Sequence, residues 1–519
     1  MTTEPIQTRD IPDHSDILIL GAGSAGCILA NRLSADPARQ VTLVEAGDFP
    51  TDPDVFDPAM WPRIQRRSYD WDYRTLPQPG TANRVHHWAR GRMVGGSSGL
   101  HAMFHVRGHV SDYDRWVAMT GDPGWSYDAL LPHFKATERY AEASDLHGTE
   151  GEMPILIPDT ETHPLVRDYI AGWQELGLPR LADHNGREVI GTAPNSLMIR
   201  DGRRVTTAEA FLRPVLHRPN LHLLTSAEVH RLRIARHRVT GVEIRTPDGA
   251  RVLSAGQVIL SLGSVADPLL LMRSGVGDGQ VLRAAGVGCV LESPELGRNL
   301  HDHMLGAGVV YRAREPLAPS RLQHSESLAY QSSRGLDVHA GAPDIVVGCV
   351  VAPSVSECFP MPAAGETYTL LFGVTHPTSR GELAITGPDL RDAPRIDPRY
   401  LSTEHDRSAF RSALGRARMV GETAALARWN GGEVLPGPDL RRADDLDAFI
   451  ARAAITHHHP VATCAMGASE RAVTRPDLTL RGLDNLAVVD ASVIPAIPCG
   501  PIHAAVMAIA QKYASDLDA

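Results

Sequence analysis

The strongest constraint on the fold is an apolar run that ends in regularly spaced glycines. Residues 16–26 read Asp-Ile-Leu-Ile-Leu-Gly-Ala-Gly-Ser-Ala-Gly. The Ile and Leu run is typical of a buried parallel strand, and the apolar spacing after it predicts a helix. Gly21 permits a tight turn, Gly23 allows backbone to approach a pyrophosphate, and Gly26 allows close helix–strand packing. The pattern predicts a doubly wound α/β sheet that binds a dinucleotide.

A second strand strengthens this interpretation, because a lone GxGxxG is weak evidence. Residues 41–44, Val-Thr-Leu-Val, predict a buried strand that ends at Glu45, 22 positions after Gly23. An acidic residue at that distance is placed to accept hydrogen bonds from a ribose diol. We therefore expect Glu45 to hold the adenosine ribose.

Length and composition exclude several other classes of protein. A chain of 519 residues is expected to form two domains or one elaborated domain. The net charge of −10 gives no support for nucleic-acid binding. Apolar runs long enough for a membrane span are absent, and the opening residues lack the pattern of a secretory signal. The six cysteines form no CxxC pair, so we expect buried thiols in a cytoplasmic protein.

A second glycine-rich segment distinguishes between dinucleotides. Residues 90–108 contain Gly-Gly-Ser-Ser at positions 95–98. Such a turn offers backbone donors and small side chains where a planar ring approaches the main chain. On its own the segment could be a structural loop. Together with the first glycine motif it indicates an extended FAD site rather than an NAD site.

Histidines near the C-terminus are candidates for proton transfer. His457, His458 and His459 are consecutive, and His503 follows His459 by 44 positions. A neutral imidazole, with an unperturbed pKa of about 6.5, suits proton removal near pH 7. The alternative interpretation of these three histidines is a metal site. Three adjacent residues in regular structure cannot all face one ion, so we expect no metal.

Further motifs relate these segments to a known family. Residues 263–277, 296–303 and 488–495 follow the glycine motifs in order. With them the chain resembles the glucose-methanol-choline oxidoreductases from about residue 16 to residue 516. The resemblance implies an FAD-binding, Rossmann-like domain and a substrate domain with an antiparallel sheet covered by helices. It also makes residues 488–495 a late strand that contacts FAD.

The resemblance implies the role of each site residue. His459 would be the general base, and His503 would bind the substrate oxygen and stabilise the developing alkoxide. His457, His458 and Pro501 would shape the substrate pocket. The residues implied for the cofactor site are Gly21, Gly23, Ser24, Ala25, Glu45, Ala46, Trp71, Arg92, Gly96, Ser97, His101, Ala102, Met103, Val229, Asp490 and Ala491.

Four departures from the family pattern matter. Many members carry Asn at the position of His101, whereas the aryl-alcohol branch carries His. Members with covalent flavin carry the linking His at the position of Leu100, so we expect noncovalent FAD. Asp267 replaces a usual Ser or Thr, and Ala462 replaces a usual Gly. Neither replacement removes a group that handles protons.

The resemblance also implies how the chain is divided. The FAD domain is expected from residues 1–157, 204–305 and 459–519, and the substrate domain from residues 158–203 and 306–458. Patterns within these segments predict strands at 368–373 and 382–386, a helix at 404–428, and an ordered Pro-rich loop at 50–63.

The implied reaction is oxidation of a primary alcohol to the aldehyde. A base removes the hydroxyl proton, hydride passes to flavin N5, and O2 is reduced to H2O2. His101 and the clustered histidines favour an aryl, furanic or pyridine-type alcohol such as pyridoxine. Two alternatives stay open: a dehydrogenase that passes electrons to a quinone, and a hydroxynitrile lyase that holds FAD without redox turnover.

Overall fold

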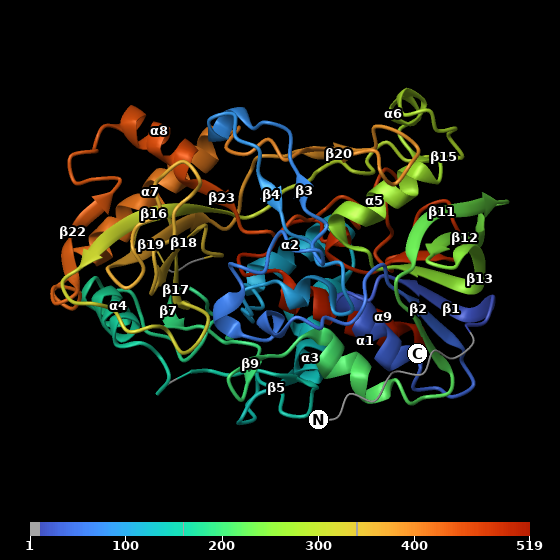
Figure 1. Ribbon diagram of the computed structural model, residues 1–519, viewed down its shortest axis with the longest axis horizontal. Helices are drawn as coiled ribbons and strands as arrows, with labels where there is room; N and C mark the ends of the chain where they lie inside the picture. The colour runs from blue at the N-terminus through green and yellow to red at the C-terminus, as the bar shows by residue number, and fades with distance from the viewer. Residues whose placement is uncertain (1–10, 159, 339–340, 519) are drawn as a thin grey trace.

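The protein is built around two large β-sheets. The computed structural model describes residues 11–158, 160–338 and 341–518. Figure 1 shows the two sheets at opposite ends of the long axis, with helical and loop segments between them. Each sheet contains seven strands. The cavity described below is lined by residues from both ends.

The first sheet contains the glycine motif. Strands β1, β2, β10, β13 and β24 pair in parallel, whereas β11 and β12 extend the sheet as an antiparallel hairpin on β13. Buried Ile and Leu side chains make β1 a central strand, as predicted. The strands, in the order of the sheet, are β10 (Leu221–Leu224), β2 (Val41–Val44), β1 (His14–Leu20), β13 (Gly249–Leu260), β12 (Arg238–Thr246) and β11 (Glu228–Ala235), with β24 (Leu486–Val488) beside β13.

Helix packing brings the two ends of the described chain together. Helix α1 (Ser24–Leu33) follows the glycine turn and packs against α9 (His503–Asp518). A Cβ atom on Gly26 would lie 1.9 Å from the carbonyl oxygen of Gly21. Only glycine therefore lets α1 approach the end of β1 this closely. The predicted role of this glycine in helix packing agrees with the structure.

The second sheet is antiparallel throughout. Helix α7 (Glu404–Gly421) packs on β18 and β19, while α4 (Pro164–Glu175) and α8 (Ala443–Ala453) pack beside it. The predicted architecture of two sheets with covering helices is confirmed, whereas the exact domain boundaries stay a prediction. The strands, in the order of the sheet, are β22 (Asn430–Leu435), β16 (Met304–Ala313), β19 (Thr367–Val374), β18 (Ile345–Val350), β17 (Ser325–Gln331) and β7 (Gly191–Pro194), with β23 (Ala454–Thr456) beside β16.

The remaining helices and strands lie outside the two large sheets. The helices are α2 (Val110–Thr120), α3 (Tyr127–Thr137), α5 (Gly263–Arg273) and α6 (Gly279–Ala284). The short strands are β3 (Tyr73–Arg74), β4 (His87–Trp88), β5 (Glu138–Arg139), β6 (Met153–Pro154), β8 (Ile199–Arg200), β9 (Arg203–Arg204), β14 (Val276–Gly277), β15 (Leu291–Glu292), β20 (Glu382–Ala384) and β21 (Arg395–Asp397). Prolines begin two 3-10 helices, Pro53–Val55 and Pro58–Met60, so the segment 50–63 is an ordered loop as predicted.

Three predicted elements extend too far along the chain, and the strand predicted at 382–386 ends at Ala384. The helix predicted at 404–428 ends at Gly421, because the Thr423 hydroxyl donates a hydrogen bond to the carbonyl oxygen of Val420 at 2.7 Å. The Glu175 side chain then accepts from the backbone of Ala424 and Ala425. The strand expected within 488–495 ends at Val488, because Asp490 turns the chain by accepting from the Ser492 backbone at 2.8 Å.

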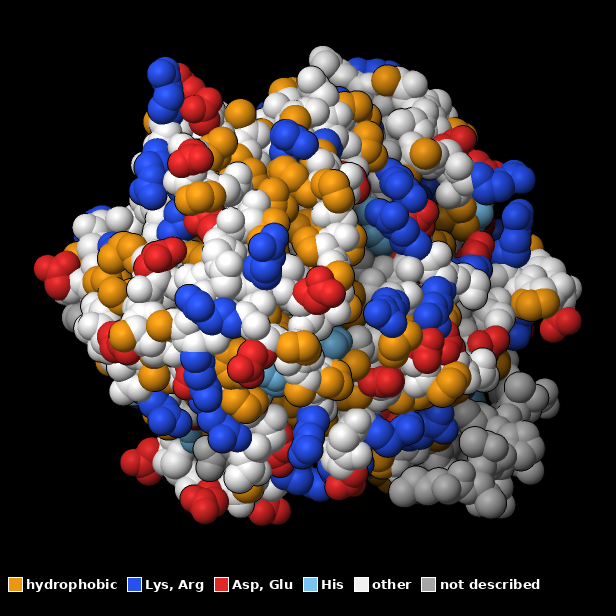
Figure 2. All heavy atoms as spheres, turned by 60° about the vertical axis from the view of Figure 1, so that its left-hand side comes forward, with side chains coloured by type: hydrophobic (Ala, Val, Ile, Leu, Met, Phe, Trp, Pro, Cys, Tyr) orange, Lys and Arg blue, Asp and Glu red, His pale blue; other side chains and the backbone are white. Residues whose placement is uncertain are grey.

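The surface carries charges of both signs. On the face drawn in Figure 2, acidic and basic side chains are interspersed rather than gathered into one patch. Helices that combine the length and apolar character of a membrane span are absent from the described residues.

The close approach of α1 to β1 gives a direct test of the first sheet. Gly26→Ala should lower the free energy of unfolding by about 2 kcal/mol or more, because backbone must move to admit the methyl group. Gly415→Ala in α7 is the matched control, since a Cβ atom there meets no heavy atom within 4 Å. The control should stabilise by about 0.5–1 kcal/mol, as expected for Gly to Ala inside a helix. Urea unfolding checks both values, and equal effects would contradict the packing argument.

Candidate active site

A cavity of about 900 Å³ lies where the two sheets face each other. At one end it is bounded by the glycine turn that follows β1. At the other end it is bounded by apolar side chains of the antiparallel sheet: Leu305, Leu328, Val346 and Leu371. A cavity of this size, apolar with a few converging polar groups, is typical of a cofactor and substrate site.

Most of the predicted site residues line this one cavity. Residues separated by up to 480 positions in the sequence are thereby brought together. Lining residues among the predicted set are Gly21, Gly23, Ser24, Ala25, Glu45, Ala46, Trp71, Gly96, Ser97, His101, Ala102, His457, His458, His459, Asp490, Ala491, Pro501 and His503.

Three predicted cofactor residues lie just behind the lining. Arg92 stacks over the Trp71 ring at 5.2 Å and pairs with Glu228 at 2.6 Å. Val229 follows Glu228 in β11 and is buried. The backbone of Met103 donates to His101 Nδ1 at 3.1 Å, so it supports a lining residue. Their direct contact with a cofactor stays a prediction.

The glycine end of the cavity fits a pyrophosphate closely. A Cβ on Gly21 would lie 2.5 Å from the Ser261 carbonyl oxygen, and a Cβ on Gly96 would lie 2.7 Å from the Gly23 Cα. Side chains are therefore excluded where the two glycine motifs meet. The N-terminus of α1 points its free N–H groups toward this place, which favours an anion. The residues present thus fit the phosphates of a dinucleotide.

Glu45 stands beside this cradle, as predicted. Its carboxylate accepts from the backbone N–H of Ala22 and of Gly47, each at 2.9 Å. Burial disfavours the charged form and raises the pKa of Glu45 to about 7, although these backbone donors oppose the shift. Each carboxylate oxygen keeps a lone pair, so the group can still accept from ribose hydroxyls.

Asp267, which stands where the family usually has a hydroxyl, is a buried acid next to Asp490. Asp490 accepts from the Gly263 backbone at 2.6 Å and lines the cavity. Burial and the neighbouring Asp490 carboxylate hold the pKa of Asp267 well above its usual value. The neutral Asp267 carboxyl can donate a hydrogen bond to Asp490, which is what a Ser or Thr hydroxyl would do.

The two predicted catalytic histidines, His459 and His503, line the cavity, and each lies against another histidine ring. His457 and His459 lie 4.3 Å apart between ring centroids, and His101 meets His503 edge-on at 4.8 Å. Both ring nitrogens of His503 and Nε2 of His101 are buried without a hydrogen-bond partner among the described residues. Buried polar atoms are normally paired, so these nitrogens are positioned for a bound molecule.

Every histidine of this group is neutral near pH 7. Burial lowers the pKa of His457 to about 4 and that of His503 to about 3. Burial, helped by neighbouring His457, His303 and Arg90, holds the pKa of His459 well below its usual value. A neutral imidazole has one nitrogen lone pair, so each of these residues can accept a proton.

His101 is oriented by Arg204, a residue that sequence reasoning missed. Arg204 is fully buried, and its guanidinium bonds the His101 carbonyl oxygen and approaches His101 Nδ1 at 3.1 Å. Arginine and the Met103 amide can only donate, so His101 Nδ1 accepts and Nε2 carries the hydrogen. The sequence held no signal for this contact, because Arg204 stands outside every motif.

Residues 457–459 do not form regular backbone, on which the expected absence of a metal rests. His458 adopts a left-handed conformation with φ 62°, and His457 and His459 turn toward each other. His303 joins them, so that one ring nitrogen from each of the three residues lies within 4.8 Å of the others. His303 Nδ1 lies 3.0 Å from His459 Nδ1, which is a hydrogen-bond distance. The absence of a metal stays a prediction.

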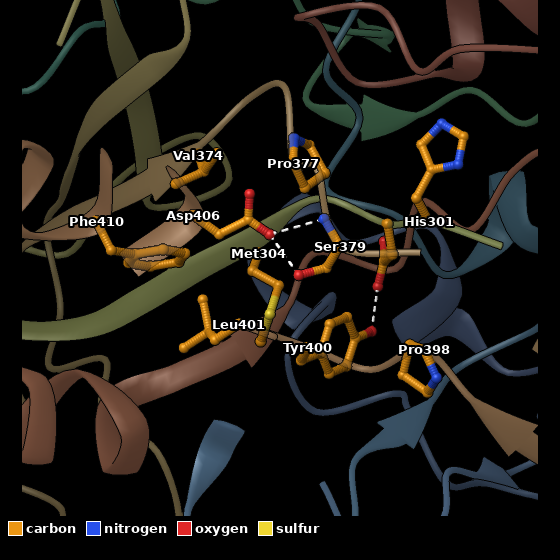
Figure 3. A pocket seen from close by; sticks show the side chains of 11 residues that line it. His301, Met304, Val374, Pro377, Ser379, Pro398, Tyr400, Leu401, Asp406 and Phe410 are labelled. Atoms are coloured by element: carbon orange, nitrogen blue, oxygen red, sulfur yellow. Dashed lines mark hydrogen bonds between the residues drawn. The ribbon is translucent and has the colours of Figure 1, made fainter. Parts of the chain in front are cut away.

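Asp302 holds the turn at His457–His459. It lies in the motif at residues 296–303, but the sequence did not indicate this role. The Asp302 carboxylate accepts from the His459 backbone at 2.7 Å and from the Thr456 hydroxyl at 2.6 Å. It also accepts from the Tyr400 hydroxyl at 2.5 Å (Figure 3). Figure 3 shows Tyr400 in the wall of a much smaller cavity, which is also lined by the hydrogen-bonded pair Asp406 and Ser379.

Comparison with known proteins places this geometry in context. Family models described as GMC oxidoreductase match residues 15–305 and 377–510. The chain is 55% identical to pyridoxine 4-oxidase of Microbacterium luteolum, over 96% of this chain and 98% of that protein. It is 34% identical to mitochondrial choline dehydrogenase of Mus musculus, over 97% of this chain and 89% of that protein. A crystal structure of pyridoxine 4-oxidase from Mesorbium loti superposes with a TM-score of 0.96 at 53% identity, covering 97% of this chain and 99% of that one.

The raised pKa of Glu45 predicts that FAD binding depends on pH. Ribose hydroxyls donate best to the ionised carboxylate, so binding below pH 7 should release the proton that Glu45 holds. The dissociation constant should therefore fall by up to about tenfold per pH unit as pH rises toward 7. In Glu45→Gln this dependence should be lost. Quenching of flavin fluorescence on titration with apoprotein measures the dissociation constant of each protein. An equal dependence of this constant on pH in wild type and Glu45→Gln would refute the role of Glu45 in binding the ribose.

Proposed function

The chain belongs to the GMC (glucose-methanol-choline) oxidoreductase family, and we propose that it oxidises a primary alcohol on a pyridine or aryl ring to the aldehyde. The observation that carries the proposal is one cavity holding a glycine cradle and two neutral histidines, His459 and His503. The similarity to pyridoxine 4-oxidases supports a pyridine alcohol such as pyridoxine.

FAD is the cofactor that this cavity fits. The glycine turn and Glu45 would hold the pyrophosphate and ribose, while Gly96 and Ser97 would lie along its length. When bound, FAD supplies the hydride acceptor, from which electrons pass to O2 with release of H2O2. Leu100, which lines the cavity, offers only carbon atoms where a covalent link would be made. We therefore propose noncovalent FAD, which acid precipitation should release into the supernatant.

His459 acts as the general base. Its Nδ1 is occupied by His303 at 3.0 Å, which leaves Nε2 to take the hydroxyl proton of the substrate. A buried imidazole that is neutral at pH 7 can accept this proton without first losing one. The Asp302 bond to the His459 backbone fixes the position of the ring relative to the cavity.

His503 positions the substrate oxygen. A ring N–H of His503 would donate to this oxygen and stabilise the negative charge that develops as the proton leaves. The edge-on contact with His101 restricts the orientation of the His503 ring. Neither nitrogen of His503 is bonded to another described residue, so the group is free to bind substrate.

The remaining wall of the cavity suits an aromatic ring with polar substituents. Phe104 lies 6.4 Å from the His457 ring, and Leu305 and Leu371 supply apolar surface. His457 is neutral, so it can donate or accept a hydrogen bond with a ring nitrogen or phenolic hydroxyl. O2 as electron acceptor is part of the proposal, and a cytoplasmic location stays a prediction from the sequence.

The decisive measurement is the visible spectrum of the holoenzyme without oxygen, before and after pyridoxine or benzyl alcohol is added. We expect the oxidised flavin band to disappear and to return with H2O2 when air is admitted. Return only with a quinone or dye would identify a dehydrogenase. An unchanged band with every alcohol would contradict alcohol oxidation and favour a lyase.

Substitution of the two histidines should separate chemistry from cofactor binding. His459→Asn should slow anaerobic bleaching by about 10²–10⁴-fold, because no base accepts the hydroxyl proton. His503→Ala should also slow bleaching, while both variants keep the FAD spectrum. His405→Asn is the control, since this exposed residue of α7 lies away from the cavity. Bleaching by His459→Asn at the rate of the control would exclude His459 as the base.

His457 is predicted to select the substrate. His457→Ala should lower kcat/KM for pyridoxine more than for benzyl alcohol, because only pyridoxine offers ring heteroatoms to this side chain. A change of about tenfold in the ratio corresponds to one lost hydrogen bond. Steady-state H2O2 release with both alcohols measures the ratio, and an unchanged ratio with intact flavin absorbance would rule out this role.

A further inference from the structure

We propose that His303, held by the carbonyl of Thr375, fixes the tautomer of His459 so that its Nε2 carries no hydrogen and faces substrate as a ready base. The proposal rests on the proposed function, because it explains how the base of that reaction is prepared. It assigns a positioning role to a histidine that never touches the reacting atoms.

The hydrogen bond between His303 and Thr375 determines which ring nitrogen of His303 carries the hydrogen. His303 Nε2 lies 2.8 Å from the backbone oxygen of Thr375, just after β19. A carbonyl oxygen can only accept, so Nε2 of His303 must carry the hydrogen. Burial lowers the pKa of His303 to about 3, so the ring is neutral and its Nδ1 has only a lone pair.

The second bond transfers this constraint to His459. The two Nδ1 atoms lie 3.0 Å apart, and the rings meet nearly at right angles, at 80°. Since His303 Nδ1 can only accept, His459 Nδ1 must donate. A neutral imidazole has a single N–H, so Nε2 of His459 is left with its lone pair. The same logic applies wherever a second group fixes the tautomer of a catalytic histidine.

Backbone contacts hold both rings in register. The His457 N–H donates to the His303 carbonyl at 2.9 Å, and the His459 N–H donates to Asp302 at 2.7 Å. These bonds continue the pairing of β23 with β16. The relay, by which we mean the two hydrogen bonds from Thr375 to His303 and from His303 to His459, is therefore anchored to the antiparallel sheet. The backbone of His459 is therefore held by the continuation of the antiparallel sheet.

The same three histidines could be arranged around a metal ion instead. A metal ion bound by both Nδ1 atoms would require His459 Nδ1 to lose its hydrogen, and the hydrogen bond between the two rings would disappear. The Thr375 contact accounts for one nitrogen of His303 and the His459 contact for the other. Both ring nitrogens of His303 thus have a hydrogen-bond partner without a metal ion. Metal content is one outcome of the test.

Turnover should reveal the relay through pH dependence. Once His459 Nε2 takes the substrate proton, the ring is positive and its Nδ1–H bond to His303 becomes stronger. A charged His303 would lower the pKa of His459, but the neutral His303 ring accepts from the Nδ1–H of His459 and so raises that pKa relative to a ring without this acceptor. Loss of the acceptor should move the acid limb of kcat/KM to lower pH and also reduce the plateau, because part of the enzyme holds the wrong tautomer.

Two polar variants separate the two bonds of His303. His303→Asn places an amide oxygen near the position of Nδ1 and keeps the acceptor for His459. His303→Gln places an amide nitrogen near the position of Nε2 and keeps only the Thr375 bond. We expect the plateau of kcat/KM to fall by about tenfold or more in the Gln variant, with its acid limb shifted to lower pH. The Asn variant should restore the wild-type limb and most of the plateau.

Flavin absorbance and thermal unfolding of each purified holoenzyme show whether the variants fold. Equal loss in both variants with an unshifted acid limb would overturn the relay and leave a structural role. Stoichiometric metal in the wild-type enzyme, lost from both variants by elemental analysis, would also overturn it. Wild-type enzyme that oxidises no alcohol would instead refute the proposed function, so the two failures are distinguishable.

Discussion

The buried carboxylate of Asp302 is the contact on which the catalytic half of the molecule depends. It collects three hydrogen bonds, from the His459 backbone, the Thr456 hydroxyl and the Tyr400 hydroxyl. Burial raises its pKa, whereas these three donors favour the charged form. Because Asp302 directly precedes the tautomer-fixing His303, one short segment determines both where His459 lies and which of its nitrogens is free.

The cofactor half follows a different principle, which is the removal of side chains. At Gly21, Gly26 and Gly96 an added methyl group would collide with backbone rather than with a movable side chain. The anion end of the cavity is therefore shaped by main chain and helix N-terminus. The alcohol end is shaped by side chains, so its chemistry can change without disturbing the cradle.

Local patterns predicted the parts of the molecule that are formed locally. The strand, turn and helix around Gly21, and the strand that ends at Glu45, depend on neighbours within about 30 residues, and each lies where it was predicted. The relay was missed because His303 meets His459 only through the pairing of β16 with β23. The expected absence of a metal depended on regular backbone at residues 457–459. His458 instead has a positive φ, in a segment that Ala89 and Arg90 contact from far away in the sequence. Arg204 was missed for the same reason.

The packing of α9 on α1 has a consequence for how the enzyme is made. The first glycine motif ends at Gly26, but β24 and α9, which complete its sheet and cover its helix, are synthesised about 460 to 480 residues later. His503 begins that final helix. The cavity can therefore close only after α9 has been synthesised, so FAD must be captured by a polypeptide that extends beyond His503 rather than by the nascent segment around the first glycine motif. Premature termination before α9 would yield a protein that lacks both His503 and the packing of α9 on α1.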